Sequence, residues 1–416
     1  MPEYASARWG LARAARRPCC DTASFGPGTQ RFPNAAGPRY NTHVLTRVYV
    51  DNFRCMVNFE CRLGSQQLIL GPNGAGKSTL FDVLALLRDL CVRGDPPADR
   101  FVGRSRTRWQ DVLEQTFELD VSGNGGLYNM RLVVDSWGNP EQPRVINEEV
   151  KFSGKSIFRF QNGEVHLFND RFEDKVQYPF DWYRSALATI TARKDNTKLS
   201  WFKRWLGGLL VVSPDPRRMS GVAAQEVRSP DQYLSNFADW YRHLRQETED
   251  FDYIKDLKEV IDRFVTMRLE DAGERRREIK IRIAASENGK SGGPDTEYLL
   301  GELSEGQRVL IGLYAVLHFA LKPEATLCFD EPDNFIALRE IQPWLTKVLD
   351  RTEDDHSVAQ VLIASHHPEL LNRMAFKEGL LLDRPDGRHT RAQPFQDPSK
   401  TGLSAAQLVA RGWERE

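Results

Sequence analysis

One glycine-rich segment constrains this chain more than any other feature. An apolar run, Leu68-Ile69-Leu70, precedes it, and Leu80, Val83, Leu84 and Leu87 follow at helical spacing. A buried strand, a glycine-rich turn and an amphipathic helix in this order are the setting of a phosphate-binding loop. A chance glycine-rich turn is the alternative, and the flanking strand and helix disfavour it. The loop residues are Gly71, Pro72, Asn73, Gly74, Ala75, Gly76, Lys77, Ser78 and Thr79.

The physics of such a loop is local. Glycines let backbone N–H groups turn toward a phosphate, and the N-terminus of the following helix adds positive partial charge. We expect Lys77 to reach the β- and γ-phosphates of a nucleotide and the Ser78 hydroxyl to bind Mg²⁺.

Composition limits the class of protein. The 416 residues allow one large domain or two ordinary ones, and a net charge of −1 leaves no global field to attract nucleic acid. The six cysteines form no paired C-x-x-C array, which favours reduced thiols in a cytoplasmic protein. The apolar run Val309–Leu321 contains His318 and is too short to span a bilayer, so we expect a buried helix and no membrane contact.

Residues 1–43 differ from the rest of the chain. They are rich in arginine, contain no lysine, and show no apolar run after the arginine cluster, so a secretory signal is not expected. We expect a disordered basic tail. A tail that touches nucleic acid and an over-extended translation start are the alternatives.

Residues 44–175 carry the phosphate loop and a series of alternating runs typical of strands. A strand is expected at Leu45–Val50, and turn signals at Asn124-Gly125, Ser153-Gly154 and Asn162-Gly163 separate the later runs. This pattern predicts an antiparallel sheet. The later runs are Thr116–Val121, Leu127–Val134, Val145–Phe152, Ser156–Phe160 and Glu164–Phe168.

The remaining chain divides in two. Residues 176–290 predict a mainly helical insertion, with helices over Gln232–Glu249 and Tyr253–Glu270. Residues 291–416 alternate helices with apolar strands at Ala325–Phe329, Val361–Ser365 and Gly379–Leu382, which predicts a parallel sheet. The expected fold class is therefore α/β, with a mixed or parallel core sheet, an antiparallel β subdomain and a helical insertion.

Three further motifs follow the phosphate loop in order. Leu303-Ser304-Glu305-Gly306-Gln307-Arg308 opens the apolar helix, the strand 326–330 ends in Asp330-Glu331-Pro332, and the strand 361–365 ends in His366-His367-Pro368. Each motif alone has an ordinary explanation, since Ser304 is a good helix N-cap and carboxylates often follow strands. All of them in this order, each on the expected element, form a strong joint signal.

At this point the chain resembles the ABC-type ATPases, in which a P-loop (Walker A), a signature motif, a Walker B strand and a switch histidine occur in this order. The large insertion before Ser304, the run 50–54 (Val-Asp-Asn-Phe-Arg) and the run 330–334 (Asp-Glu-Pro-Asp-Asn) resemble the RecF, SMC and OLD-like branch more than a transporter ATPase. The resemblance covers residues 44–415 and implies an AAA-family ATPase with a P-loop NTPase fold.

The resemblance also implies roles for individual residues. Residues 71–79 hold the phosphates of ATP, Ser78 and Asp330 hold Mg²⁺, Glu331 polarises the attacking water, and His366 senses the γ-phosphate. Ser304, Gly306 and Gln307 of a second copy complete the site from the helix N-terminus, which predicts an ATP-dependent homodimer.

The motifs depart from the family pattern in places. Glu305 replaces a signature glycine, and Ala337 stands where the loop after Walker B usually carries aspartate or histidine. Gln115 is a weak candidate for the Q-loop glutamine, and a surface residue is the favoured interpretation.

The biological role is open between three hypotheses. The short segment after His366 leaves no room for a Toprim nuclease domain, so the first hypothesis is an ATPase that switches a nucleic-acid-directed or anti-phage defence system through a separately encoded effector such as a nuclease. The second is a RecF-like repair ATPase that clamps DNA, and the third is an ATP-switched scaffold with slow turnover.

Two basic clusters bear on DNA binding. One combines basic residues with Trp201 and Trp205, and the other surrounds Arg275-Arg276-Arg277. Both are candidates to grip a phosphate backbone. The alternative is a solvated face with paired acidic residues, among them Glu274 and Glu278. The other basic residues are Arg193, Lys194, Lys198, Lys203 and Arg204 in the first cluster, and Lys280 and Arg282 in the second.

Overall fold

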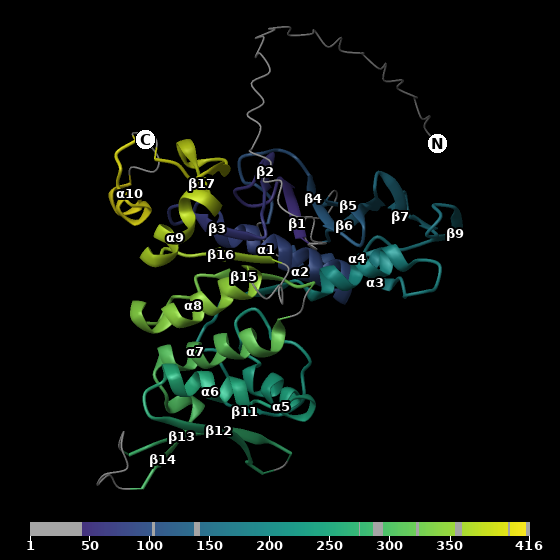
Figure 1. Cartoon of the computed structure of the whole chain (residues 1–416). Coiled ribbons are helices and arrows are strands. Elements are labelled where there is room, and N and C mark those ends of the chain that lie inside the picture. The colour runs from purple at the N-terminus through teal and green to yellow at the C-terminus, as the bar shows by residue number, and fades with distance from the viewer. Residues whose placement is uncertain are drawn as a thin grey trace, which may run out of the picture. The chain divides into compact units, whose positions relative to one another are not determined.

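The computed structural model describes residues 44–101, 105–136, 142–273, 275–285, 294–321, 324–353, 360–397 and 400–412. The expected N-terminal tail, residues 1–43, lies outside these residues. The described chain forms three β-sheets with helices packed between and around them, and its fold class is α/β as expected (Figure 1). None of the helices in these ranges is both long and apolar enough to cross a membrane.

A six-stranded central sheet carries the phosphate loop. Its first five strands run parallel and β18 is antiparallel. Leu68 and Leu70 face one hydrophobic core and Ile69 faces the other, because the strands are covered on both sides. The strand order is β10 (Leu210–Val212), β15 (Thr326–Asp330), β16 (Gln360–Ala364), β3 (Gln66–Leu70), β17 (Gly379–Asp383) and β18 (Arg391–Pro394).

Helices cover both faces of this sheet (Figure 1). Helix α1 (Lys77–Arg88) packs its apolar side into the core that contains Ile69. The opposite face is covered by α7 (Glu305–Ala315), α8 (Leu338–Glu353) and α9 (Pro368–Glu378). Helix α10 (Ala405–Arg411) packs beside α9.

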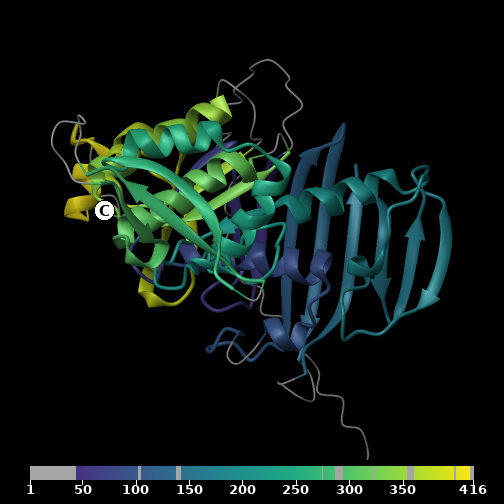
Figure 2. The same cartoon turned by 90° about the horizontal axis from the view of Figure 1, so that it is seen from below.

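An eight-stranded antiparallel sheet forms a second layer, as the sequence predicts (Figure 2). Positive φ angles at Asn124-Gly125, Ser153-Gly154 and Asn162-Gly163 are those of two-residue hairpin turns, which confirms the three turn signals. The sheet order is β2 (Phe59–Arg62), β1 (Val44–Asp51), β4 (Glu114–Gly123), β5 (Gly126–Asp135), β6 (Arg144–Phe152), β7 (Lys155–Gln161), β8 (Glu164–Phe168) and β9 (Asp174–Pro179).

Short helices close one side of this sheet. They are α2 (Pro97–Arg100), α3 (Ala186–Thr189) and α4 (Thr197–Gly208). Helix α4 buries Trp201, Phe202 and Trp205, and Tyr128 of β5 stacks on Trp201 with ring centroids 4.9 Å apart. The aromatic cluster of α4 is therefore part of the core.

The prediction of a helix over Tyr253–Glu270 is wrong for the second half of this segment. Helix α6 (Phe251–Val260) ends early, and the chain continues as β12 (Phe264–Asp271), which pairs with β13 (Arg277–Ile283). Met267 opposite Ile281 and Leu269 opposite Ile279 place apolar side chains together. This cross-strand burial outweighs the local helical spacing.

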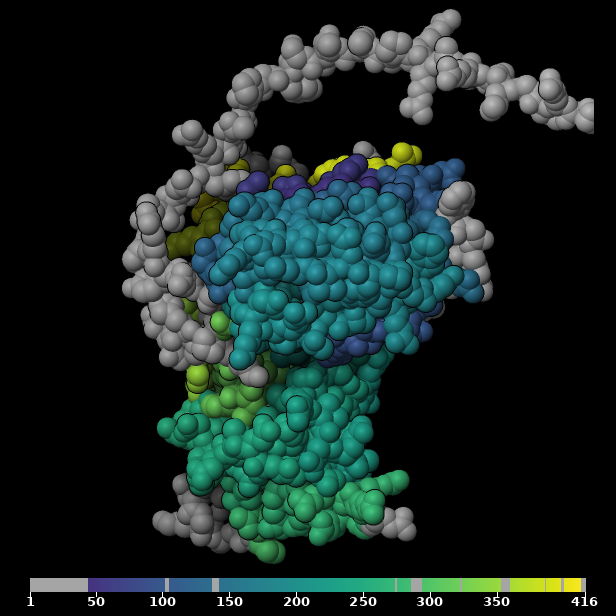
Figure 3. Space-filling view, turned by 90° about the vertical axis from the view of Figure 1, so that its right-hand side faces the viewer, coloured from purple at the N-terminus to yellow at the C-terminus, as the bar shows by residue number. Residues whose placement is uncertain are grey.

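Residues 176–290 are thus helical only in part. Besides α5 (Phe237–Glu247) and α6 they supply β10 to the central sheet, and β11 (Val222–Ala223), β12 and β13 join β14 (Thr296–Leu299) in a small third sheet. In Figure 3, the blue to teal surface belongs to the eight-stranded sheet, and the teal to green surface belongs to the helices α5 and α6 and the third sheet.

Candidate functional site

The ends of three neighbouring parallel strands bring the motifs together. Ala364 at the end of β16 is aligned with Asp330 of β15 on one side and with Ile69 of β3 on the other. The chain leaves β3 into the phosphate loop, β15 into Glu331 and β16 into Ser365-His366. In parallel sheets, ligands bind outside this carboxyl edge of the strands. Motifs far apart in the sequence therefore meet at one place.

The phosphate loop depends on its glycines. Gly71, Gly74 and Gly76 have φ angles of 140°, 79° and 108°, a region that favours glycine. A side chain at position 71 would also collide with the carbonyl oxygen of Leu382 in β17. Gly76 is the N-cap of α1 and provides no side-chain oxygen, so the first N–H groups of α1 are available to an anion.

Lys77 is buried inside this loop. Its side chain is 4% exposed, and Nζ donates a hydrogen bond to the carbonyl oxygen of Gly71 at 2.8 Å. Burial lowers the pKa of Lys77, and the carboxylates of Glu331 and Asp330 act in the opposite direction. The ammonium group is therefore held in place before a phosphate arrives.

Asp330 and Ser78 fit a divalent cation. Asp330 is 6% exposed, and burial raises its pKa to about 6 although a hydrogen bond with Ser78 acts to lower it. Its Oδ1 is buried and has no hydrogen-bond partner among the described residues. An orphaned carboxylate oxygen beside a serine hydroxyl suits Mg²⁺, which keeps several waters and takes one or two protein ligands plus substrate phosphates. No group of three or more His, Cys, Asp and Glu in the described chain is placed to hold a metal.

Glu331 has an unusual backbone conformation. Its φ angle is +50°, where residues other than glycine are uncommon, and its N–H donates to the carbonyl oxygen of Ala364 at 2.8 Å. The side-chain amide of Asn334 donates to Glu331 Oε2 at 2.7 Å. Backbone strain of this kind costs about 1–3 kcal/mol and clusters at functional sites. Asn334 belongs to the run 330–334, but no sequence pattern predicts that it orients Glu331.

The two histidines after β16 differ in their surroundings. His366 is exposed on one side, and the partial loss of hydration of its ring, followed by the Lys77 ammonium, lowers its pKa. His367 is buried and caps α9, with Nδ1 accepting from the N–H of Glu369 and Nε2 lying 3.2 Å from the carbonyl oxygen of Leu338. His367 is therefore used by the fold, whereas His366 is free to meet a ligand.

His366 and the phosphate loop share a cavity of about 490 Å³. The end of α10 forms its other side. The lining residues are Leu70, Gly71, Pro72, Asn73, His366, Leu381, Val409 and Gly412.

The signature segment begins α7 with a capping box. Ser304 Oγ accepts from the N–H of Gln307 at 3.2 Å, and Gln307 Oε1 accepts from the N–H of Ser304 at 3.1 Å. Ser304 is exposed, and a side chain at Gly306 would lie 2.9 Å from the carbonyl oxygen of Phe335. Helices α7 and α1 contribute to different cores on opposite faces of the central sheet (Figure 1).

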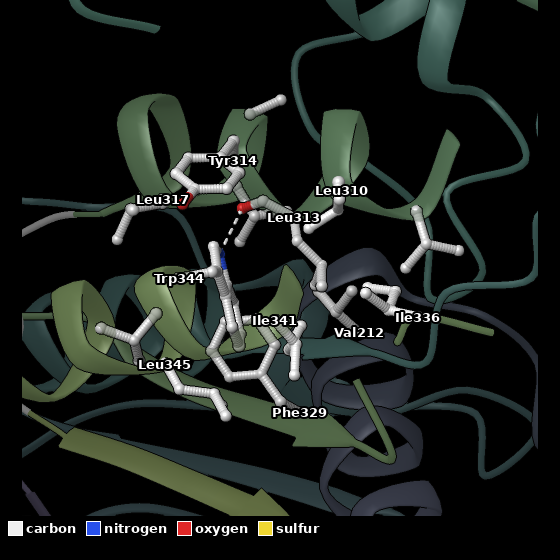
Figure 4. Packing of buried hydrophobic residues seen from close by; sticks show 14 of the residues in the cluster. Val212, Leu310, Leu313, Tyr314, Leu317, Phe329, Ile336, Ile341, Trp344 and Leu345 are labelled. Atoms are coloured by element: carbon white, nitrogen blue, oxygen red, sulfur yellow. Dashed lines mark hydrogen bonds between the residues drawn. The ribbon is translucent and has the colours of Figure 1, made fainter. Parts of the chain in front are cut away.

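Helix α7 is anchored to the strand that ends in Asp330. Trp344 of α8 donates from its indole N–H to the carbonyl oxygen of Leu313 in α7 at 3.0 Å (Figure 4). The same indole packs edge-on against Phe329 of β15, with ring centroids 4.9 Å apart. No sequence pattern predicts this connection, because it depends on how α7, β15 and α8 pack against one another in space.

Gln115 is not the surface residue that was expected. It is fully buried, and its amide donates to the carbonyl oxygen of Asn52 at 3.0 Å. Asn52 in turn donates from its side chain to the carbonyl oxygens of Val112 and Glu114. Gln115 therefore helps to fix the loop after β1.

The basic clusters are largely neutralised or used by the fold. Trp201 and Trp205 are buried and present no face for a base to stack on, and Lys203 donates to the carbonyl oxygen of Ala188 at 3.0 Å. In the third sheet, Lys280 pairs with Glu270 at 2.7 Å. Further pairs are Arg277 with Asp271 and Arg282 with Asp295. Glu274 lies outside the described residues.

Comparisons with known proteins agree with a P-loop ATPase domain. Residues 223–372 match the family model described as "AAA domain, putative AbiEii toxin, Type IV TA system". The match includes the signature, Asp330-Glu331 and His366, and the phosphate loop precedes it.

A curated relative, the "OLD nuclease" of Thermus scotoductus, is 33% identical over 95 residues, which is 21% of this chain and 16% of that protein. The matched region thus spans less than a fifth of the relative. A solved structure, "Crystal structure of the SmcHead bound to the C-winged helix domain of ScpA", is 13% identical with a TM-score of 0.49, covering 88% of this chain and 99% of that chain.

Proposed function

We propose that this protein is a Mg²⁺-dependent ATPase whose active site is completed by a second copy of the chain. The observation that carries the proposal is the meeting of the phosphate loop, Asp330-Glu331 and His366 at the carboxyl edge of β3, β15 and β16. The glycine conformations and the orphaned Oδ1 of Asp330 support nucleotide and metal binding there.

Each residue then has a physical task. Residues 71–79 cradle the phosphates of ATP, and Lys77 moves from the carbonyl oxygen of Gly71 onto the β- and γ-phosphates. Ser78 and Asp330 would hold Mg²⁺, and the bound cation would neutralise negative charge that develops on the phosphates. Glu331, oriented by Asn334, accepts the proton of the attacking water. His366 lies beside the γ-phosphate in the neutral form that its lowered pKa favours.

In this proposal the second copy supplies the positively polarised N-terminus of its helix α7 to the nucleotide site. Ser304, Gly306 and Gln307 stand at an exposed helix N-terminus, and such an end stabilises an anion. Since α1 and α7 pack on opposite faces of the central sheet within one chain, the γ-phosphate of one copy meets α7 of its partner. Two ATP molecules are sandwiched in the resulting homodimer.

The printed names of the matches support a role in defence. One name refers to a toxin of a toxin–antitoxin system and the other to a nuclease, and on this basis the ATPase is taken to control a toxic or nucleic-acid-directed activity. We place that activity in a separately encoded effector, such as a nuclease, in the cytoplasm. The buried Trp201 and Trp205 disfavour the DNA-clamp alternative at that surface.

Four variants test the assignment. Lys77→Ala should abolish ATP binding, whereas Glu331→Gln should bind ATP and release no phosphate. In the Glu331→Gln background, analytical ultracentrifugation should show an ATP-dependent dimer. Adding Ser304→Asp should abolish that dimer, while the matched Ser304→Asn should keep more of it, because both residues cap helices and only the first brings a negative charge to the γ-phosphate. A monomer under all conditions would refute the sandwich.

A further inference from the structure

A second group of side chains lies beside the phosphate loop and has no part in the chemistry described above. It consists of Trp109, which precedes β4, and of Arg384 and His389, which belong to the loop between β17 and β18. The indole N–H of Trp109 points at Nδ1 of His389 at 3.4 Å, and the two rings meet edge-on with centroids 5.8 Å apart. The guanidinium carbon of Arg384 lies 5.8 Å from the centroid of the Trp109 ring.

The loop that carries two of these groups is fastened to the phosphate loop. Arg384 Nη1 donates to the carbonyl oxygen of Gly74 at 3.1 Å, and Thr390 Oγ donates to that of Ala75 at 2.9 Å in a buried hydrogen bond. Thr390 also lies against Gly76, where an added side chain would approach its hydroxyl to 3.0 Å. The position of Trp109 is therefore fixed relative to the phosphate cradle by a short chain of contacts.

Trp109 leaves a large apolar area open to water at this position. Its side chain is 41% exposed, although contacts at the ring edge and from the Arg384 guanidinium hold its orientation. An aromatic ring held in this way is a stacking surface, because every nucleobase has a π-face and an adjacent guanidinium adds cation–π attraction.

We propose that Trp109, Arg384 and His389 form the platform that receives the base of the bound nucleoside triphosphate, with Trp109 as the stacking residue. This inference rests on the proposed function, since it assumes that the phosphates occupy residues 71–79. The platform selects for a purine, because a purine covers more of the indole face than a pyrimidine does. The orientation of the indole by His389 makes that residue a positioning residue and not a catalytic one.

The chain offers a matched control in Trp182. This tryptophan is 39% exposed and carries the Arg144 guanidinium carbon 5.3 Å from its ring centroid, so its exposure and its cation contact resemble those of Trp109. It packs against Gly163 and pairs through its carbonyl oxygen with Val145, on the eight-stranded sheet. Trp182 thus shares the local chemistry of Trp109 without its link to the phosphate loop.

The test separates base binding from phosphate binding. Affinities for ATP and for inorganic tripolyphosphate are measured by isothermal titration calorimetry on the full chain with Mg²⁺. Trp109→Ala should weaken ATP binding between about fivefold and a hundredfold, the range expected for the loss of one base–aromatic stack, and leave tripolyphosphate unchanged. Trp182→Ala should leave both affinities unchanged.

A second measurement uses only conservative variants. If ATP stacks on Trp109, ATP should change the tryptophan fluorescence of the wild type and of Trp182→Phe, and this change should be largely lost in Trp109→Phe. Equal weakening of ATP and tripolyphosphate in Trp109→Ala, unchanged ATP affinity, or a persistent fluorescence change in Trp109→Phe would each overturn the platform. Failure of the wild type to bind either ligand would instead overturn the proposed function.

Discussion

Replacing Asp330 by asparagine should stabilise the metal-free protein while removing its activity. Burial raises the pKa of Asp330 from 3.8 to about 6, which corresponds to a cost of about 3 kcal/mol in the free energy of unfolding when the carboxylate is ionised in the fold. Asparagine has nearly the same shape and carries no charge. In the presence of EDTA at pH 8, we therefore expect Asp330→Asn to be more stable than the wild type by about 1–3 kcal/mol.

The pH dependence of this difference has a definite sign. Below pH 3.8 the carboxyl is protonated in both the folded and the unfolded chain, so Asp330 contributes no penalty. Between 3.8 and about 6 the unfolded chain releases the proton and the folded chain keeps it, so the penalty grows as the pH rises. Above about pH 6 the penalty is complete. Urea denaturation with EDTA at several values between pH 4.5 and pH 8 measures this growth.

A matched control has the opposite expected sign. Asp89 is buried to the same degree, at 4% exposed, but forms ion pairs with Arg88, Arg93 and Arg100. Asp89→Asn should therefore destabilise the protein, by about 3 kcal/mol, because buried arginine charge loses its partner. Destabilisation by Asp330→Asn at every pH, or a gain that does not change with pH, would refute the electrostatic reasoning.

Three further variants test the geometry of the site. Gly71→Ala should lower the free energy of unfolding by about 2 kcal/mol or more and abolish ATP binding in calorimetry. The reason is that the φ of 140° at this position and the carbonyl oxygen of Leu382 leave no room for a methyl group. A normal ATP affinity would contradict this. Glu331→Gly should raise the free energy of unfolding in urea by about 1 kcal/mol by relieving a φ of +50°, while phosphate release stops. Trp344→Ala should lower the free energy of unfolding by about 3–5 kcal/mol in the same urea assay, since a buried indole and its hydrogen bond to Leu313 are lost. A loss below 1 kcal/mol would show that α7 is held by other contacts.

The sequence predicts best where the chemistry is local. The strand, turn and helix around Lys77 depend on neighbouring residues, and the hairpin turns depend on asparagine, serine and glycine at positions with positive φ. The parallel sheet then places the Asp330 and His366 motifs next to the loop, because all of them follow parallel strands. Strand order alone therefore accounts for most of the candidate site.

The features that sequence patterns missed depend on how separate segments pack together. Residues 264–270 have helical spacing, yet they form β12 and pair with β13, the next strand along the chain, and a helical pattern does not include the cross-strand contacts of Met267 and Leu269. Gln115 is polar, which favours the surface, yet it lies in β4, is fully buried and donates to the carbonyl oxygen of Asn52, 63 positions away in the chain. Arg384 meets the phosphate loop only because β17 lies next to β3.

The contacts of Trp344 give a physical reason why completion of the site by a partner should affect catalysis. Its indole is bonded to the backbone of α7 and packed against Phe329, the residue before Asp330. Gly306 in the first turn of α7 leaves no room for a side chain against the carbonyl oxygen of Phe335, in the turn that follows Glu331. Close-packed contacts of this kind transmit small displacements instead of absorbing them. In the proposed dimer, a γ-phosphate that draws the N-terminus of α7 toward it should therefore also move the turn that holds Glu331, so that closure of the dimer and alignment of the attacking water occur together.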